Sequence, residues 1–270
     1  MNTPNHDDHT ASFASLLQSA VSEPGKIHAA YFAFHGYSIG NQLPALMQCA
    51  ERGIAPGPIA SFNTWKERGR YVQKGERAIA LWMPITVRRA VDQESIDPEQ
   101  VAFTRFLLKR NWFVLSQTHG KDYAPEPIPH WDSTRALQTL GIEQIAFDHI
   151  DGNVWGFDRG KQIAVSPLSP MPDRTLLHEV GHVVLGHTAE SVEQDGPRTP
   201  RSVREVEAEG VAFICSAALG LDGAEYSRGY LQHWLAGTAI AERSCQRIFR
   251  AADAILRAGR STQTYEQGQL

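Results

Sequence analysis

Apolar residues recur every three or four positions along several stretches of this chain, a spacing that predicts amphipathic helices. In the stretch 41–52, Leu43, Leu46 and Met47 share one face, and Gly53 follows as a stop signal. The same spacing predicts further helices at 12–21, 26–35, 133–140, 173–186, 202–220, 227–236 and 238–258. The second half of the chain is therefore expected to be mainly helical.

Short runs rich in β-branched and aromatic residues predict strands between these helices. In the first half the runs are Thr64-Trp65, 78–87 and 112–118, with a charged loop at 88–100. In the second half they are 144–150, 153–158 and 161–166, separated by the turn dipeptides Asp151-Gly152 and Arg159-Gly160. A small sheet followed by helices is typical of the α+β class.

Three prolines between Tyr123 and Pro129 mark a domain boundary. Residues 26–125 carry thirteen Lys or Arg against eight Asp or Glu, a net charge of +5, whereas residues 126–270 carry a net −6. Opposite charges favour two modules, with any polyanionic partner binding the first. We therefore predict two domains, 12–125 and 126–270, after a polar and disordered tail.

The composition of the chain indicates the cellular compartment in which the protein acts. No apolar run is long enough for a membrane helix, and the first residues lack the segments of a secretory signal. Cys49, Cys215 and Cys245 are scattered and form no CxxC pair, which argues against disulfides and against a cysteine zinc site. These features predict a cytoplasmic protein without a membrane partner.

The chemically most informative segment is an HExxH motif, His178-Glu-Val-Gly-His182, within a predicted helix. The four-residue spacing puts both histidines on one face, where their imidazoles can bind one Zn²⁺. Glu179 lies beside them and can act as a base on a bound water. The alternative is a core helix with two hydrogen-bonded histidines and a chance glutamate.

Residues at both ends of this helix indicate where it starts and stops. Asp173 is the expected N-cap and Gly186 the expected stop. His187 comes five residues after His182, whereas the HExxHxxGxxH pattern requires six. We therefore interpret His187 as a helix-end residue near the negative end of the dipole and not as a ligand.

A third ligand is expected from the segment 205–209, Glu-Val-Glu-Ala-Glu, at the start of an apolar helix. Glu205 and Glu209 share a face, which suits one metal-binding carboxylate and one carboxylate that orients a histidine. Glu207 points elsewhere and is the alternative ligand. Small residues at 208, 210 and 212 favour close approach to the HExxH helix. Each glutamate could instead be a solvated acid at a helix N-terminus.

The sequence HEVGHVVLGH followed by E-V-E-A-E resembles the gluzincin arrangement of ImmA/IrrE-type peptidases, whose second helix carries E-x-x-A-N. This resemblance makes Glu205 the third ligand and implies a zinc-dependent metallopeptidase that cleaves a protein or peptide; another divalent metal stays an alternative. Glu replaces Asn at position 209, which leaves the orienting role open. Candidates for the group that stabilises the oxyanion are Tyr226, Tyr230 and His233.

Basic and aromatic residues are interleaved between positions 65 and 77. Basic groups can follow a phosphate backbone and aromatic rings can stack on bases. The alternative is a solvated, charged hairpin at a sheet edge. The candidate DNA-binding residues are Trp65, Lys66, Arg68, Arg70, Lys74 and Arg77.

Several short blocks of the first half occur in a characteristic order. They are Tyr37-Ser38, Asn41-Gln42, Trp65, Gly69-Arg70, Lys74-Gly75-Glu76 and Ser116-Gln117-Thr118. In this order they are similar to the N-terminal single-stranded-DNA-binding domain of ArdC-type antirestriction proteins, in which a metallopeptidase-like domain follows. The resemblance implies single-stranded DNA as a partner and protection of incoming mobile DNA from restriction.

Three hypotheses remain open at this point. The first is a single-stranded-DNA-binding zinc metallopeptidase that acts in antirestriction. The second is a non-catalytic protein that coats single-stranded DNA and uses its metal site for structure alone. The third is a DNA-associated metallohydrolase whose substrate is not a peptide.

Overall fold

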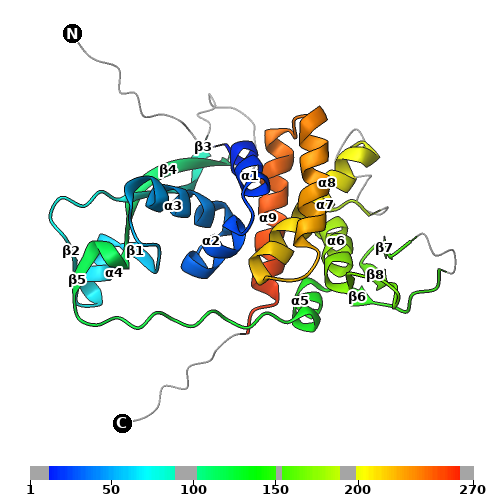
Figure 1. Ribbon diagram of the computed structural model, residues 1–270, viewed down its shortest axis with the longest axis horizontal. Helices are drawn as coiled ribbons and strands as arrows, with labels where there is room; N and C mark the ends of the chain where they lie inside the picture. The colour runs from blue at the N-terminus through cyan, green and yellow to red at the C-terminus, as the bar shows by residue number, and fades with distance from the viewer. Residues whose placement is uncertain (1–11, 89–101, 150–153, 189–198, 262–270) are drawn as a thin grey trace, which may run out of the picture. The chain divides into compact units, whose positions relative to one another are not determined.

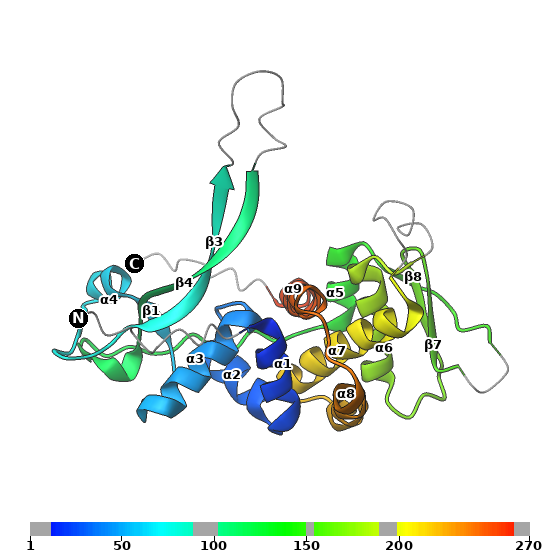
Figure 2. The same cartoon turned by 90° about the horizontal axis from the view of Figure 1, so that it is seen from above.

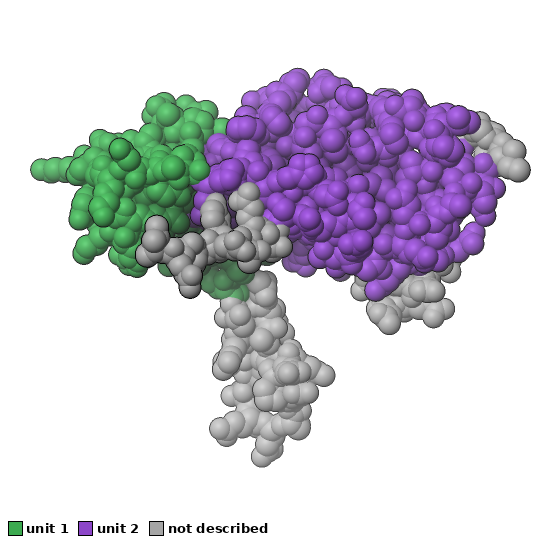
Figure 3. Space-filling model, turned by 90° about the horizontal axis from the view of Figure 1, so that it is seen from below, with its two compact units in different colours: residues 1–11, 40–125 green, residues 12–39, 126–270 purple. Residues whose placement is uncertain are grey.

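The computed structural model describes residues 12–88, 102–149, 154–188 and 199–261. These residues form two compact units (Figure 3). Unit 1 comprises the described residues between Gly40 and Pro125, and unit 2 combines Ser12–Ile39 with the described residues after Glu126. The units therefore change at the predicted proline-rich boundary, but the segment 12–39, which we assigned to the first domain, belongs to the second unit.

Unit 1 contains two antiparallel sheets (Figure 1). In the first sheet the strand order is β1-β4-β3, and in the second β2 pairs with β5. The elements in chain order are α3 (Ile39–Arg52), β1 (Ile59–Ser61), α4 (Phe62–Glu67), β2 (Arg70–Val72), β3 (Ile79–Arg88), β4 (Ala102–Val114), the 3₁₀ turn η2 (Leu115–Gln117) and β5 (Thr118–Gly120). Figure 2 shows β3 and β4 as a long twisted ribbon.

Helix α3 covers part of the edge strand β3 through two side-chain amides. Asn41 accepts from the Trp82 backbone N–H at 2.7 Å and donates to the Trp82 carbonyl at 3.0 Å. Gln48 makes the same pair of bonds with Ala80, each at 2.9 Å. Edge strands expose unpaired backbone groups, so these two amides, at spacing i and i+7 on α3, satisfy that edge and fix the helix on it.

Two predictions in unit 1 need correction. Thr64 and Trp65 were predicted as strand and instead lie in α4, which begins because the Ser61 hydroxyl accepts from Thr64 N–H at 3.2 Å. The segment 112–118 is not one strand, since it spans the end of β4, η2 and the start of β5. The predicted loop 88–100 lies almost wholly outside the described residues, whereas the strand at 78–87 is confirmed as β3.

Unit 2 is a group of helices packed beside a three-stranded sheet of order β6-β8-β7. The helices are α1 (Phe13–Ser22), α2 (Lys26–Phe34), α5 (Ser133–Leu140), α6 (Pro172–Leu185), α7 (Arg201–Leu219), α8 (Ala224–Gly237) and α9 (Glu242–Ala258). The strands are β6 (Glu143–Gln144), β7 (Gly156–Arg159) and β8 (Gln162–Val165). Every predicted helix of this half is confirmed within a few residues; the strand predicted at 144–150 is only two residues long.

Helices α1 and α2 belong to this unit because they contact the helices of the second half of the chain. Glu242 of α9 accepts hydrogen bonds from the backbone N–H groups of Phe13 and Ala14, both at 2.9 Å, and so caps α1. The buried residues of both helices, Leu16 and Ile27 among them, lie in the same core. Helices α1 and α2 thus pack with unit 2, although they precede unit 1 in the chain.

Helix α7 is central to the unit and is mostly buried from Val206 onward. A Cβ atom added to Gly181 of α6 would lie 3.3 Å from Val211 Cβ and 3.4 Å from the Ala208 carbonyl oxygen, so α6 and α7 approach closely there. Gly210, which we expected to face α6, instead faces Ile248 of α9. Close packing on both sides holds α7 firmly in register with its neighbours.

The α+β class is confirmed, with helices and small sheets in each unit. No helix among the described residues is both long and apolar enough to cross a membrane. Cys49, Cys215 and Cys245 are all free and buried, as the sequence predicts for scattered thiols.

Candidate functional site

Helix α6 carries the HExxH residues. It begins with Pro172 at its first position and ends at Gly186, whose φ of +72° gives the left-handed C-cap. Met171 is the N-cap residue and makes no side-chain cap, so the expectation that Asp173 caps the helix is wrong. Asp173 lies in the first turn, where its charge suits the helix dipole.

Three side chains converge between α6 and α7. The Nε2 atoms of His178 and His182 lie 3.2 Å apart, and each lies 3.6 Å from Glu205 Oε2. With metal–ligand bonds of about 2.0–2.2 Å, the ligands of a tetrahedral zinc ion lie roughly 3.3–3.5 Å from one another. The spacing of the cluster therefore fits one small divalent ion with a fourth position left for another ligand.

The charge distribution of this cluster also suits a cation. Burial alone would lower the pKa of His178, but contact with Glu205 and Glu209 raises it to about 9. The two histidines in turn hold the pKa of Glu205 well below its usual range. Because the surrounding carboxylates favour a positive charge this strongly, they also stabilise a divalent cation at this position.

Glu179 lies beside the cluster and is only 7% exposed. Burial raises the pKa of its carboxyl to about 7, although His178 and His182 act in the opposite direction. A carboxyl with a pKa near neutrality is suited to accept and return a proton. Its side chain packs against β7, where a Cβ atom on Gly156 would lie 2.7 Å from Glu179 Oε1.

Glu209 lies behind His178. Its Oε2 atom is 3.1 Å from His178 Nδ1 and forms an ion pair with Arg174 of α6. Burial would raise the pKa of Glu209, but His178 and Arg174 lower it to about 2. These contacts suit the orienting role that we considered for Glu209.

Glu207 lies on another side of α7. It is 1% exposed, and its Oε2 atom accepts from His187 Nε2 at 2.8 Å. Of the three glutamates in the segment, Glu205 is therefore the one that faces both histidines, and the geometry favours it over Glu207 as the ligand. His187 follows the end of α6, as expected.

Among the three oxyanion candidates, Tyr230 of α8 has the best support. Burial raises the pKa of its phenol, and the negative charges of Glu209 and Glu205 act in the same direction. Tyr226 packs on Arg174, with the guanidinium carbon 4.9 Å from the ring centre. His233 is exposed and has no contact that links it to the site.

The predicted DNA-binding residues of unit 1 fall into two groups. Lys66, Lys74 and Arg77 are exposed. Arg70 is used within the fold, because its guanidinium donates to the side chain and carbonyl of Thr118 and to the carbonyl of Lys121. Lys66, Lys74 and Arg77 can therefore follow a phosphate backbone. Arg68 is exposed as well, but its guanidinium lies over Trp65 and Tyr123.

The expectation that Trp65 stacks on bases is contradicted. Its ring is 0% exposed, and its indole N–H donates to the Phe113 carbonyl at 2.8 Å. Arg68 covers the same cluster, since its guanidinium lies over Trp65 and Tyr123 and donates to the Tyr123 hydroxyl at 3.1 Å. The aromatic side chain that we passed over is Tyr71, which is 51% exposed; its position in strand β2, between two half-buried neighbours, was the available signal.

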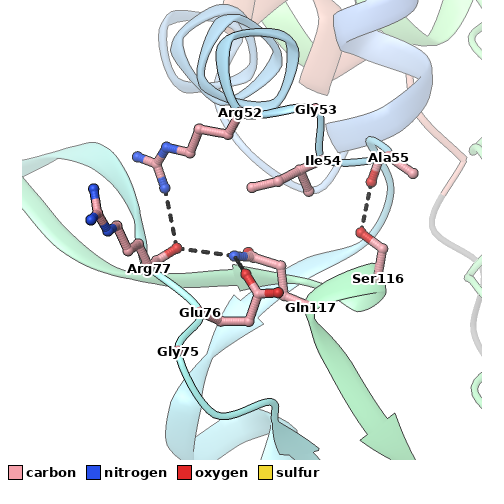
Figure 4. Close-up of a pocket in the computed structure, with 9 residues that line it drawn as sticks. All are labelled: Arg52, Gly53, Ile54, Ala55, Gly75, Glu76, Arg77, Ser116 and Gln117. Carbon is pink, nitrogen blue, oxygen red and sulfur yellow. Dashed lines mark hydrogen bonds between the residues drawn. The ribbon is translucent and has the colours of Figure 1, made fainter.

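An open pocket of about 470 Å³ in unit 1 adjoins Arg77 (Figure 4). Arg52 is held at its wall by hydrogen bonds to the carbonyls of Arg77 and Ala78 and to Gln48. The buried Gln117 donates to Glu76 at 2.7 Å and to the Arg77 carbonyl at 3.0 Å. The pocket thus combines two arginines with polar groups that are held in place.

Comparison with known proteins relates the chain to one family of antirestriction proteins. The family profile for the N-terminal domain of anti-restriction factor ArdC matches residues 17–112. No curated protein sequence matches the chain. The fold is similar to the Mn(II)-bound crystal structure of the antirestriction ArdC protein from plasmid R388, with 17% identity, a TM-score of 0.53, and coverage of 93% of this chain and 99% of that chain. The metal-free crystal structure of that protein gives 18% identity and a TM-score of 0.48, with coverage of 92% and 94%.

The fold and the cluster define the class of α+β proteins in which an HExxH helix and a glutamate from a second helix form a candidate metal site. Residues 17–112 match the ArdC N-terminal domain, and the fold is similar to that of ArdC over most of the chain. The chain is therefore similar to ArdC proteins, by the family profile over residues 17–112 and by its fold over most of its length.

Proposed function

We propose that this protein is an antirestriction factor that binds single-stranded DNA through unit 1 and holds a divalent metal at His178, His182 and Glu205. The convergence of these three side chains, with Glu179 buried beside them, carries the proposal. Two imidazoles and one carboxylate suit zinc, and they also suit Mn²⁺, the ion in the related ArdC structure. We propose that the protein acts in the cytosol, where incoming DNA meets restriction enzymes.

The chemistry that we propose for this site is hydrolysis of a peptide bond. When bound, a divalent metal supplies a Lewis acid that acidifies water and polarises a carbonyl oxygen. Glu179 accepts the proton of the attacking water at a carboxylate oxygen and returns it to the leaving amine. The Tyr230 hydroxyl is the candidate donor to the carbonyl oxygen as negative charge develops there.

Strand β7 offers a way to orient such a substrate. In the described part of the chain β7 pairs with β8 on one side only, and Gly156 at its start adjoins Glu179. An extended peptide added to the other edge of β7 would gain main-chain hydrogen bonds beside the base. This arrangement favours a peptide over other hydrolysable substrates.

For DNA we propose a surface formed by Lys66, Lys74 and Arg77 together with the ring of Tyr71. The lysines and arginine would contact phosphates, and the tyrosine would stack on a base. The pocket beside Arg77 is wide enough to accept one unstacked base. A fluorescent oligothymidine, titrated at several salt concentrations against the wild type and Tyr71→Ala, tests this surface, with duplex DNA of equal length as the comparison.

Metal content and Glu179→Gln test the site itself. Metal analysis of the purified protein should give one divalent ion per chain in the wild type and in Glu179→Gln, because Glu179 is not a ligand, and much less in His178→Ala. Loss of proteolysis and of protection from restriction in Glu179→Gln would support a peptidase. Full protection with Glu179→Gln would instead favour the DNA-coating hypothesis, and a wild type without metal would refute the proposed site.

A further inference from the structure

Behind His182 lies a buried pair of residues that the proposed metal site does not use. His187 Nδ1 lies 3.1 Å from His182 Nδ1, and His187 Nε2 lies 2.8 Å from Glu207 Oε2. All three side chains are buried. His182, His187 and Glu207 therefore form one continuous line of hydrogen bonds, which begins at the cluster and ends at a carboxylate.

The direction of these hydrogen bonds follows from the chemistry of a metal ligand. His182 faces the cluster with Nε2, so Nε2 must keep its lone pair, and the proton of the neutral ring must lie on Nδ1. That N–H then donates to His187 Nδ1, which must be unprotonated. The proton of His187 consequently lies on Nε2, where it donates to the Glu207 carboxylate. Binding of the metal through His182 Nε2 thus fixes the tautomers of both His182 and His187.

We propose that His187 and Glu207 are positioning residues, which hold His182 in the tautomer and ring orientation that bind the metal. This inference rests on the metal site proposed above. Both ring nitrogens of His187 are engaged, one by His182 and one by Glu207, which explains why His187 is not itself a ligand. The pair acts on the metal only through His182.

The surroundings of the pair suit this role. Arg247 of α9 lies 3.5 Å from Glu207 Oε2, so the buried carboxylate has a counter-charge. Arg204 donates to the His187 carbonyl at 3.0 Å and Arg247 to the Leu185 carbonyl at 2.5 Å, which fixes the chain just after α6. His187, immediately beyond the C-cap Gly186, thus contacts both His182 of α6 and Glu207 of α7.

Both histidines of the cluster are then supported in the same way. Glu209 contacts His178 directly and pairs with Arg174, whereas Glu207 supports His182 through His187 and pairs with Arg247. All the carboxylates come from α7. Outer groups that orient ligating histidines typically contribute about 10- to 100-fold to metal affinity.

The test compares metal affinity in the full-length wild type, His187→Phe and Glu207→Gln. Phenylalanine keeps the ring volume but removes both nitrogens, and glutamine keeps the acceptor but removes the charge. Competition with a chelator should give Zn²⁺ binding weaker by roughly 10- to 100-fold for His187→Phe, with a smaller loss for Glu207→Gln. His187→Gln retains an acceptor for His182 and should recover part of the loss.

A matched control separates positioning from simple destabilisation. Ile248→Val removes one methyl group from the same helix-packing core, where Ile248 packs on Gly210 of α7, and keeps all three side chains of the pair and of His182. It should lower the melting temperature of the metal-free protein but leave metal affinity unchanged. An equal loss of affinity in Ile248→Val and His187→Phe would overturn the proposal.

Three further outcomes are decisive. If His187→Phe is too unstable to purify, long-range ¹H–¹⁵N spectra of the metal-loaded wild type replace the affinity measurement. These spectra should show protons on His182 Nδ1 and His187 Nε2. The opposite tautomer of His187 would overturn the proposal. Unchanged affinity in both variants overturns the positioning role alone. A wild type that binds no metal overturns the proposed site and this inference together.

Discussion

Gly156→Ala tests whether Glu179 is held in place by contact with β7. The backbone angles at Gly156 are ones that alanine can adopt, so the effect of the substitution is steric. The new Cβ would lie 2.7 Å from Glu179 Oε1, 2.8 Å from Thr175 Cγ2 and 2.9 Å from Glu179 Cγ, whereas ordinary contact begins at 3.4 Å. The closest contact is therefore about 0.7 Å too short.

Since Glu179 is buried, it has little room to move away. Overpacking of this kind typically costs about 1–3 kcal/mol. A shift of the base by an ångström can also reduce the rate of the reaction about 100-fold. Metal affinity should not change, because Glu179 is not a proposed ligand.

Chemical denaturation, metal titration and any peptidase assay of the loaded protein together check these expectations. Gly229→Ala is the matched control, since nothing lies within 4 Å of its added Cβ in the interior of α8. That variant should be as stable as the wild type or slightly more stable. A Gly156→Ala protein with wild-type stability, and with Glu179 unmoved in its crystal structure, would refute the reasoning.

Three further predictions concern the metal, the fold of unit 1 and DNA. The pKa of His178 is about 9 without metal, and a ligating imidazole must be neutral, so metal binding at pH 7 should release about one proton and metal affinity should rise between pH 7 and 9. Calorimetry in buffers of different ionisation enthalpy measures this proton release, and binding without any proton release would contradict the prediction. Trp65→Ala should destabilise unit 1 by about 3–5 kcal/mol, seen in its melting, because it empties a core position. Lys74→Ala and Arg77→Ala should each flatten the salt dependence of single-stranded-DNA binding by roughly one unit of slope, and an unchanged slope in both would count against the proposed surface.

The helices of unit 2 could be predicted because their apolar faces dominate their sequences. The helix 133–140 is correct to the residue, since Asp132 caps it and Gly141 ends it. Helix α4 could not be predicted in this way. It has six residues, and its sequence is rich in aromatic and β-branched types; burial of Trp65 and the Ser61 cap decide its conformation. Tertiary packing overrides local preference in so short a segment.

The same distinction holds for the site. The proximity of His178, Glu179 and His182 follows from helix geometry alone, so five residues of sequence suffice to predict it. The choice of Glu205 over Glu207 depends on the rotation of α7 relative to α6, which two glycines and their partners set. The role proposed for His187 needs its distance to Glu207, twenty residues away, and no spacing rule supplies that.

The position of the segment 12–39 in unit 2 affects the folding of the protein during synthesis and the behaviour of its fragments. Phe13 and its cap Glu242 are separated by 229 residues, so at about 5–20 residues per second a ribosome completes that contact roughly 10–50 s after α1 emerges. During this interval Leu16, Ile27 and the other core residues of α1 and α2 lack their partners. A fragment cut at residue 125 would leave them uncovered permanently and prone to aggregate, whereas 40–125 retains all of the contacts within unit 1.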